Sequence, residues 1–350
     1  MYDIITIGTA TRDVFLKSPL FRVLRDPQYL LCFALGSKIE INPPIFTTGG
    51  GATNAAVTFS RQNLKVATLI KIGLDESAEY ILKELRREKI VSLAVKNKKQ
   101  KTAYATILLA PTGERTILVY RGASEDLKIK EIPFNKLKSQ WAYISPGTIT
   151  FPVIQRIFNH FRENKTLIAF NPSKYFLEMG IKKLKPLLNK TKVVILNREE
   201  AAVLAGIDYQ KEKEIFKKLD EVVEGIAIMT QGAKGVLVSD GTRIYQAKAF
   251  RSRKVIDRTG AGDAFASGFV AGLIRSQSAN RPEAEQARYG AGKAQIGRFA
   301  PSDLQFAIRL GSANATSVIE HIGAKEGILT KKESQNPRWR LLRVKIIKIK

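Results

Sequence analysis

The chain has 350 residues, a formal net charge of +26, one cysteine and two histidines. This length allows one large α/β domain or two ordinary domains. The single cysteine excludes an intrachain disulfide, and two histidines are too few for a histidine-based metal cluster. No stretch is as long as a membrane span, and the N-terminus lacks a signal-peptide pattern. We therefore expect a cytoplasmic protein with no membrane partner.

The basic charge would suit nucleic acid, acidic lipid or anionic small molecules as partners. The lysines are spread along the chain, and no nucleic-acid motif accompanies them. A solvated basic surface is therefore favoured over nucleic-acid binding as the main function. Residues 331–350 form a basic, partly alternating tail. For this tail we favour an edge strand protected by lysines over a polybasic contact with membrane or nucleic acid.

A short apolar strand is predicted from Asp3 to Gly8, and Asp13 lies beyond its C-terminal end. Ligands of open α/β sheets bind at that end of the strands, which makes Asp13 a candidate ligand contact. Capping of a turn explains Asp13 equally well. Residues 14–48 are irregular, except that residues 37–41 alternate like a strand.

The first glycine-rich turn, Gly49-Gly50-Gly51, opens a predicted helix of small residues. Glycines let a ligand approach the backbone closely. Asn54, on the first turn of this helix, can both donate to and accept from hydroxyl groups. A tight turn with a packed helix N-terminus is the alternative, because a glycine triplet alone is a weak signal.

The middle of the chain changes rhythm at Trp141. Before it, a strand (66–72) and an amphipathic helix (76–88) precede a hairpin of residues 102–110 and 115–121. We expect this hairpin, together with the alternating segment above, to form a small sheet that acts as a lid. After Trp141, strands and helices alternate, which indicates a parallel or mixed sheet covered by helices.

Polar residues gather where the strands of this second region end, at the edge where α/β sheets bind ligands. Asn197 and Glu200 lie three apart on a first helical turn and therefore share a face. An amide and a carboxylate suit Mg²⁺, although a capping box has the same spacing. Thr230, Gly232 and Gly235 either cradle a nucleotide or only form a hairpin turn.

The second glycine-rich turn runs from Asp257 to Asp263 and leads into an apolar helix over residues 264–274. Gly260 and Gly262 allow backbone conformations closed to larger residues. The N–H groups and the positive dipole end of the helix favour an anion, most often a phosphate. Asp263 is then a candidate base for an attacking hydroxyl. The alternative on this stretch alone is a helix N-cap.

After this helix, residues 277–302 are predicted to be loop or short helices, and residues 304–319 an amphipathic helix that contains Asn314. The chain lacks the motifs of P-loop enzymes, dinucleotide-binding folds, protein kinases and serine hydrolases. Two glycine-rich turns, each opening a helix of small residues, remain as the main signals.

These stretches together resemble the ribokinase (PfkB) family of sugar and nucleoside kinases. Two motifs carry the resemblance, namely residues 49–56 and the highly specific residues 257–265. Lesser matches, in family order, are Asp13, Asn197 with Glu200, residues 230–232, residues 313–315 and residues 323–324.

The resemblance implies a three-layer α/β/α fold with a predominantly parallel central sheet and a small β lid. The kinase domain would cover about residues 1–330, with the lid from about 14–48 and 95–123. The lid could pair with a second subunit, as in several relatives. Three departures leave the substrate open, namely Gly51 where the family often has lysine, a long 14–48 segment and an extended polar segment over residues 277–302.

The resemblance also implies transfer of the γ-phosphoryl of ATP to an alcohol group, with Mg²⁺ and in many members K⁺. It makes Asp263 the base and the N–H groups of Gly260, Ala261, Gly262 and Asp263 the anion hole. The resemblance implies that the substrate is bound by Asp13, Gly50, Gly51 and Asn54. It implies Mg²⁺–phosphate contacts by Asn197 and Glu200, with Mg²⁺ held by Glu200 through water. Nucleotide binding is implied for Thr230, Gly232, Gly235 and Asn314, and a K⁺ site for Asp257.

A hexose or a pentose is favoured as the substrate. This sugar could already be phosphorylated. An adenosine-like nucleoside is the alternative. A nucleic-acid or acidic-surface binding protein on a kinase scaffold ranks below both, because the Asp263 motif is intact.

Overall fold

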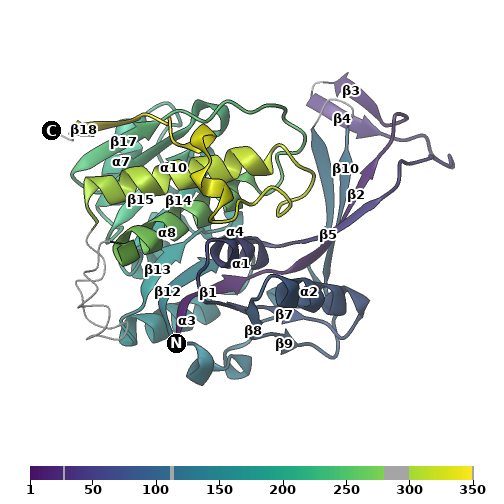
Figure 1. Ribbon diagram of the computed structural model, residues 1–350. Helices are drawn as coiled ribbons and strands as arrows, with labels where there is room; N and C mark the ends of the chain where they lie inside the picture. Colours follow the sequence, from purple (N-terminus) through teal and green to yellow (C-terminus); the bar gives the residue numbers. More distant parts are fainter. Residues whose placement is uncertain (27, 111–113, 280–298, 349–350) are drawn as a thin grey trace.

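The computed structural model describes residues 1–26, 28–110, 114–279 and 299–348. A ten-stranded sheet forms its body, in the order β18-β17-β16-β15-β14-β13-β12-β1-β6-β8 (Figure 1). Neighbouring strands from β8 to β15 are parallel, and those from β15 to β18 are antiparallel. The strands are β1 Tyr2–Gly8, β6 Val66–Leu69, β8 Val91–Ser92, β12 Ser139–Ser145, β13 Leu167–Phe170, β14 Val193–Asn197, β15 Ile226–Thr230, β16 Val236–Ser239, β17 Arg243–Ala247 and β18 Val344–Lys348.

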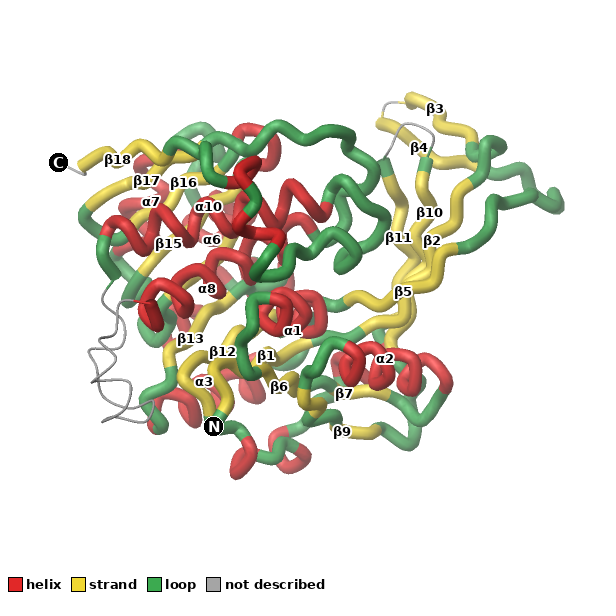
Figure 2. Tube along the Cα trace, in the orientation of Figure 1, coloured by secondary structure: helices red, strands yellow, loops and turns green. Residues whose placement is uncertain are grey.

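Helices cover both faces of this sheet (Figures 1 and 2), which confirms the predicted three-layer α/β/α class. Ile4 of β1 packs in one core and Ile5 in the other, because side chains alternate along a strand. Helices α1, α2, α8 and α10 pack on the first face, and α3 to α7 on the second. Their bounds are α1 Gly51–Arg61, α2 Glu76–Arg87, α3 Phe151–Glu163, α4 Lys174–Leu177, α5 Gly180–Leu188, α6 Arg198–Ala205, α7 Glu212–Asp220, α8 Ala261–Ala279 and α10 Pro301–Val318.

A second sheet of four strands, in the order β11-β10-β2-β5, projects from the body (Figure 2). Its strands are β2 Thr11–Lys17, β5 Ile45–Gly49, β10 Ala103–Leu109 and β11 Arg115–Tyr120. The predicted hairpin is confirmed, since β10 and β11 are antiparallel and Tyr104 lies opposite Tyr120. Strand β2 follows β1 after two residues, so one segment passes from the large sheet into the small one. We call this small sheet the lid sheet.

The strand predicted over residues 37–41 is wrong, because the structure has no strand there. Ser37, Lys38, Glu40 and Ile41 are exposed, so the alternating pattern has no face to bury. The strands that complete the lid sheet beside the β10–β11 hairpin are β2 and β5. The long segment after β2 also contains an antiparallel pair, β3 Arg22–Asp26 and β4 Gln28–Cys32.

The single strand predicted over residues 66–72 is divided in two at Ile70. The first part is β6, and the second, β7 Lys71–Ile72, pairs with β9 Val95–Lys96. The C-terminal tail forms β18, an edge strand beside β17. Most of the predicted loop over residues 277–302 lies outside the described residues. No described helix is long and apolar enough to cross a membrane.

Short 3₁₀ turns complete the described chain. They are η1 Gly122–Glu125, η2 Ile129–Glu131, η3 Phe134–Lys136, η4 Gly232–Lys234, η5 Glu333–Gln335 and η6 Pro337–Trp339.

Candidate active site

The N-terminal turns of α1 and α8 meet at the carboxylate of Asp263. Nδ2 of Asn54, on the first turn of α1, donates a 2.9 Å hydrogen bond to Oδ2 of Asp263. Nδ2 of Asn171, which follows β13, donates to the other oxygen, Oδ1, at 3.5 Å. Two glycine-rich turns that are distant in sequence therefore form one site.

Asp263 does not act as a helix N-cap. It is the third residue of α8, and its side chain accepts hydrogen bonds from Asn54 and Asn171. Burial raises the pKa of Asp263, while the bond from Asn54 and the positive charge of Lys325 oppose that rise. A carboxylate whose neutral form is favoured by its surroundings is well suited to accept a proton.

The turn before α8 combines one tightly packed glycine with one open glycine. Gly260 has φ 77°, and a Cβ there would overlap Ala324. Gly262 faces open space, with no atom within 4 Å of an added Cβ. The first N–H groups of α8 have no partner within the helix, and a phosphate can reach them on the open side.

A cavity of about 170 Å³ lies beside Asp263. It is lined by Asn171, Ile195, Leu196, Asn197, Glu200, Thr230, Gly262 and Asp263. Residues predicted as the base, the anion turn, the Mg²⁺ contacts and the nucleotide site thus surround one space. The lining residues come from the C-terminal ends of β13, β14 and β15 and from the starts of α6 and α8.

Asn197 and Glu200 form a complete capping box at the start of α6. Oδ1 of Asn197 accepts from the Glu200 N–H at 2.8 Å, and Oε2 of Glu200 accepts from the Asn197 N–H at 2.7 Å. Burial raises the pKa of Glu200, and the nearby charges of Asp263 and Glu199 raise it further. The capping alternative is therefore realised in this structure, with both residues still lining the cavity.

The donors around this cavity fit a loosely held Mg²⁺. The charge of Asp263 disfavours ionisation of Glu200, and a divalent cation would relieve that repulsion. Within the described residues, no three His, Cys, Asp or Glu side chains cluster as a metal cage. Mg²⁺ usually keeps several waters and needs only one or two carboxylates, so this sparse set suits it.

Asp13 lies in the centre of the lid sheet. It pairs with Ala105 of β10 and Thr47 of β5, so it sits inside strand β2 and caps no turn. Oδ1 of Asp13 accepts from Thr11 Oγ1 at 2.7 Å, and its side chain is only 7% exposed. Burial raises the pKa of Asp13, an effect that Thr11 and Lys325 oppose.

The glycine triplet is required by close packing around it. A Cβ at Gly49 would overlap the Asp13 carboxylate, and a Cβ at Gly51 would overlap Ser145 Oγ. Gly50 has φ 97° and a Cβ there would overlap the Thr9 carbonyl. Beyond this turn, Oδ1 of Asn54 is buried and has no hydrogen-bond partner among the described residues. That oxygen is a free acceptor for a hydroxyl.

Two predicted residues have their polar groups inside the fold. Both oxygens of Asp257 accept protein donors, Oδ1 from Thr259 and Oδ2 from the Gly323 N–H at 3.1 Å. Asn314 is 1% exposed, donates to the Ala264 carbonyl at 2.8 Å and accepts from the Leu329 N–H. Asn314 therefore ties α10 to α8 and is absent from the cavity lining, unlike Thr230.

The two glycines after β15 differ in their surroundings. Gly235 has φ 105°, and a Cβ there would overlap the Ala247 carbonyl, so the hairpin itself requires this glycine. Gly232 has φ 56° and faces open space. Neither lines the cavity, so a ligand contact at this turn stays a prediction.

Lys325 is a buried cation whose role the sequence did not indicate. It is 2% exposed, and its Nζ donates to Thr48 Oγ1 and to Oε2 of Glu84, the latter at 3.2 Å. Its positive charge lowers the pKa of both Asp13 and Asp263, against the rise that burial causes. Asn171 was also missed, although its place directly after β13 was a usable signal.

Known proteins share this architecture. The model of the pfkB family carbohydrate kinases matches residues 25–331. An "uncharacterized sugar kinase" of Archaeoglobus fulgidus is 26% identical over 275 residues, which cover 77% of this chain and 97% of the relative. A cytidine kinase of Thermococcus kodakarensis is 29% identical over 251 residues, which cover 71% of this chain and 86% of that relative. The solved structure of a ribokinase of Giardia lamblia has the same fold, with a TM-score of 0.76 and 18% identity. The match covers 95% of this chain and 98% of the ribokinase. The chain therefore belongs to the pfkB family of carbohydrate kinases.

Proposed function

We propose that the protein transfers the γ-phosphoryl group of ATP to an alcohol group of a small polyhydroxylated substrate. The observation that carries this proposal is the position of Asp263. Its carboxylate lies on the first turn of α8, beside a cavity and next to N–H groups that can hold a phosphate. A base at a phosphate site is the arrangement that phosphoryl transfer to a hydroxyl needs.

In the proposed reaction, the substrate oxygen forms a bond to the γ-phosphorus while the bond from that phosphorus to the bridging oxygen breaks. ADP leaves, and Asp263 accepts the hydroxyl proton. The N–H groups of Gly260, Ala261, Gly262 and Asp263 stabilise the charge on the transferred group. Bound Mg²⁺ would neutralise the remaining phosphate charge, and Glu200 with Asn197 would hold its waters.

The substrate would lie between the lid sheet and α1. Oδ1 of Asn54 is a buried unpaired acceptor in the described structure, and it would accept a hydrogen bond from a substrate hydroxyl. Asp13 would accept a second one, and the backbone of Gly50 and Gly51 would contact the sugar. Thr230, Gly232 and Gly235 would contact the nucleotide, through the cavity wall and the turn after β15.

For the monovalent cation, Asp257 remains our proposed ligand. Its carboxylate already joins the loop before α8 to Gly323. A K⁺ ion bound there would stabilise the segment that places Gly260, so K⁺ would act on turnover and leave the chemistry to Asp263.

A sugar or sugar phosphate is the favoured substrate, and a nucleoside is the second candidate. The cytidine kinase relative, at 29% identity, supports the second candidate. The net charge of +26 favours an anionic substrate within the first. A panel of hexoses, pentoses, their phosphates and nucleosides, assayed with ATP by ADP release, tests both. Absence of ADP release above the ATPase background with every acceptor would contradict the proposal.

A homodimer formed through the lid sheet is also proposed. Strand β11 is at the edge of that sheet, and its Ile117, Leu118, Val119 and Tyr120 are between 41% and 58% exposed. An exposed apolar edge strand is a template for pairing with another chain.

A further inference from the structure

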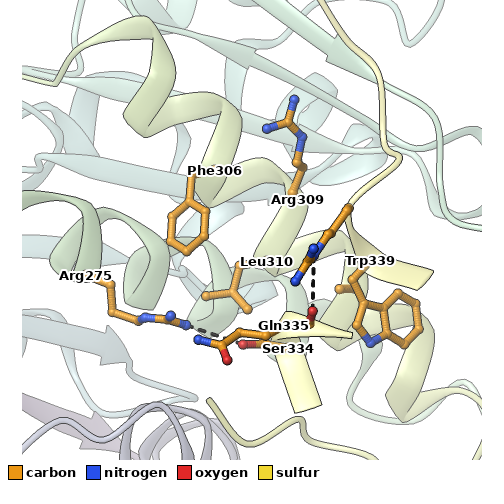
Figure 3. A pocket seen from close by; sticks show the side chains of 9 residues that line it. Arg275, Phe306, Arg309, Leu310, Ser334, Gln335 and Trp339 are labelled. Atoms are coloured by element: carbon orange, nitrogen blue, oxygen red, sulfur yellow. Dashed lines mark hydrogen bonds between the residues drawn. The ribbon is translucent and has the colours of Figure 1, made fainter. Parts of the chain in front are cut away.

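A second cavity lies far along α8 from Asp263, between α8, α10 and the C-terminal segment that contains η5 and η6 (Figure 3). Its volume is about 260 Å³. Three arginines, Arg275, Arg309 and Arg340, contribute to its wall together with aromatic and aliphatic side chains. We propose that this cavity binds a small organic phosphate with one ring system, of the size of a nucleoside monophosphate.

The three guanidinium groups bond to neutral protein groups in the described structure. Arg275 donates to Gln62 Oε1 at 2.5 Å and to Ser334 Oγ at 3.4 Å. Arg309 donates through Nε to the Leu342 carbonyl, and Arg340 donates through Nε to the Gln335 carbonyl. An arginine has five N–H donors, so each side chain keeps donors for an anion.

Two other partly buried arginines of this chain, Arg61 and Arg338, have a carboxylate partner. Arg61 pairs with Glu88 at 2.8 Å, and Arg338 pairs with Glu320 at 2.6 Å. These pairs raise the pKa of Arg61 and of Arg338. Burial lowers the pKa of Arg275, and no carboxylate among the described residues opposes that effect. A partly buried cation without a protein counter-ion is costly, and a bound anion would remove that cost.

The rest of the wall suits the ring of the ligand. Phe306, Leu310 and Trp339 line the same cavity, and Figure 3 shows the Phe306 ring between Arg275 and Arg309. The Arg275 guanidinium lies 5.3 Å from the centre of the Phe306 ring. A flat apolar group could pack on these side chains while its phosphate contacts the arginines.

This cavity is separate from the candidate active site. Asp263 and Arg275 lie on the same helix, twelve positions apart, which corresponds to roughly 18 Å along its axis. The two cavities share no lining residue. A substitution that changes ligand binding at one cavity can therefore be distinguished from one that changes binding at the other cavity.

The test uses Trp339 as a reporter in the full-length protein. The chain contains two tryptophans, Trp141 and Trp339, so a ¹⁵N-labelled sample gives two indole N–H signals. Replacement Trp339→Phe assigns them. Titration with AMP is expected to shift the Trp339 signal saturably, and adenosine is expected to bind at least about tenfold more weakly, since it lacks the charge-assisted bonds. Inorganic phosphate, as a third ligand, is expected to shift the same signal with lower affinity.

Two variants measure the contribution of the arginines. Arg340→Gln, at an exposed side chain, and Arg309→Gln are each expected to weaken AMP binding about tenfold. Arg22→Gln, an exposed residue of β3 with the same change of charge, is the matched control and should bind AMP normally. The proposal is overturned by an unshifted Trp339 signal at millimolar AMP, by equal affinity for adenosine, or by unchanged affinity in both arginine variants.

Discussion

Asn54 and Asp263 are 209 positions apart in the chain, and one hydrogen bond of 2.9 Å joins their side chains. The bond runs from the amide Nδ2 to a carboxylate oxygen, so it holds the carboxylate at the point where the first turns of α1 and α8 meet. The opposite end of the amide, Oδ1, has no partner among the described residues. Asn54 can therefore position the proposed base and a substrate hydroxyl at the same time.

Replacement of Asp263 by asparagine should remove most turnover while ATP still binds. The amide has nearly the same shape but cannot accept the hydroxyl proton, so kcat should fall about 10²–10⁴-fold. Steady-state kinetics with the best substrate of the panel measures kcat, and calorimetry measures ATP affinity. The control is Asp208→Asn, at an exposed carboxylate outside the cavity. Near-normal turnover in Asp263→Asn would contradict the assigned base.

Replacement of Asn54 by alanine should shift the pH dependence of activity. Burial raises the pKa of Asp263, and the bond from Asn54 opposes the rise by stabilising the ionised form. Without that bond the pKa of Asp263 rises further, and the base is ionised only at higher pH. The acid limb of the kcat/KM profile should therefore move to higher pH. Asn159→Ala, in α3, is the control. If the acid limb of the profile did not move in Asn54→Ala, the bond from Asn54 would not set the pKa of Asp263.

The sequence predicted the parts of the site that depend on local backbone chemistry. The turn from Gly260 to Asp263 was identified because glycines and a helix N-terminus follow each other in the chain. The alternation of strands and helices after Trp141 likewise indicated the sheet, because each unit is local. The strand expected over residues 37–41 failed because alternation alone does not show whether a face is buried.

Contacts between distant segments could not be predicted in this way. Lys325 lies 241 positions from Glu84 and 277 from Thr48, and no local pattern marks it. The resemblance implies a nucleotide contact for Asn314, which stays a prediction, while the bonds of its amide to Ala264 and Leu329 inside the fold had no local signal. Such roles depend on which segments pack together, and local patterns along the chain do not show this.

Replacement of Lys325 by methionine should strongly destabilise the protein. The substitution leaves Glu84, which is 9% exposed, without its buried cation, while its other partner, Arg87, is 69% exposed and lies 3.7 Å away. Breaking one partner of a buried pair typically costs about 3–5 kcal/mol. The double variant Lys325→Met with Glu84→Leu should recover most of this loss, because no charge is then left unpaired. Denaturant unfolding of the two single variants and the double variant measures the coupling. Additive losses would show that the pair is not coupled.

Replacement of Leu118 by lysine should prevent a dimer through the lid sheet. Leu118 is 58% exposed on the edge strand β11, so a charge there should not affect folding of the subunit. Sedimentation analysis is expected to show a dimer for the natural sequence and a monomer for the variant. Val203→Lys, at a residue of α6 that is 57% exposed, is the matched control. A dimer that persists in Leu118→Lys would place the interface elsewhere.

Replacement of each glycine of the anion turn by alanine should separate fold from function. Gly262 faces open space inside a helix, so Gly262→Ala should leave the free energy of unfolding unchanged or raise it by up to about 1 kcal/mol. Its methyl group would project toward the cavity beside Asp263, where the phosphate should approach, and the KM for ATP should rise at least about tenfold.

Gly260→Ala should behave in the opposite way. Its φ of 77° and the overlap with Ala324 make any side chain strained, at a cost of about 1–3 kcal/mol. Thermal unfolding and ATP kinetics on both variants test the contrast. If Gly262→Ala bound ATP normally, the N–H groups at the start of α8 would not be the phosphate site, because a methyl group there must crowd any phosphate that contacts them.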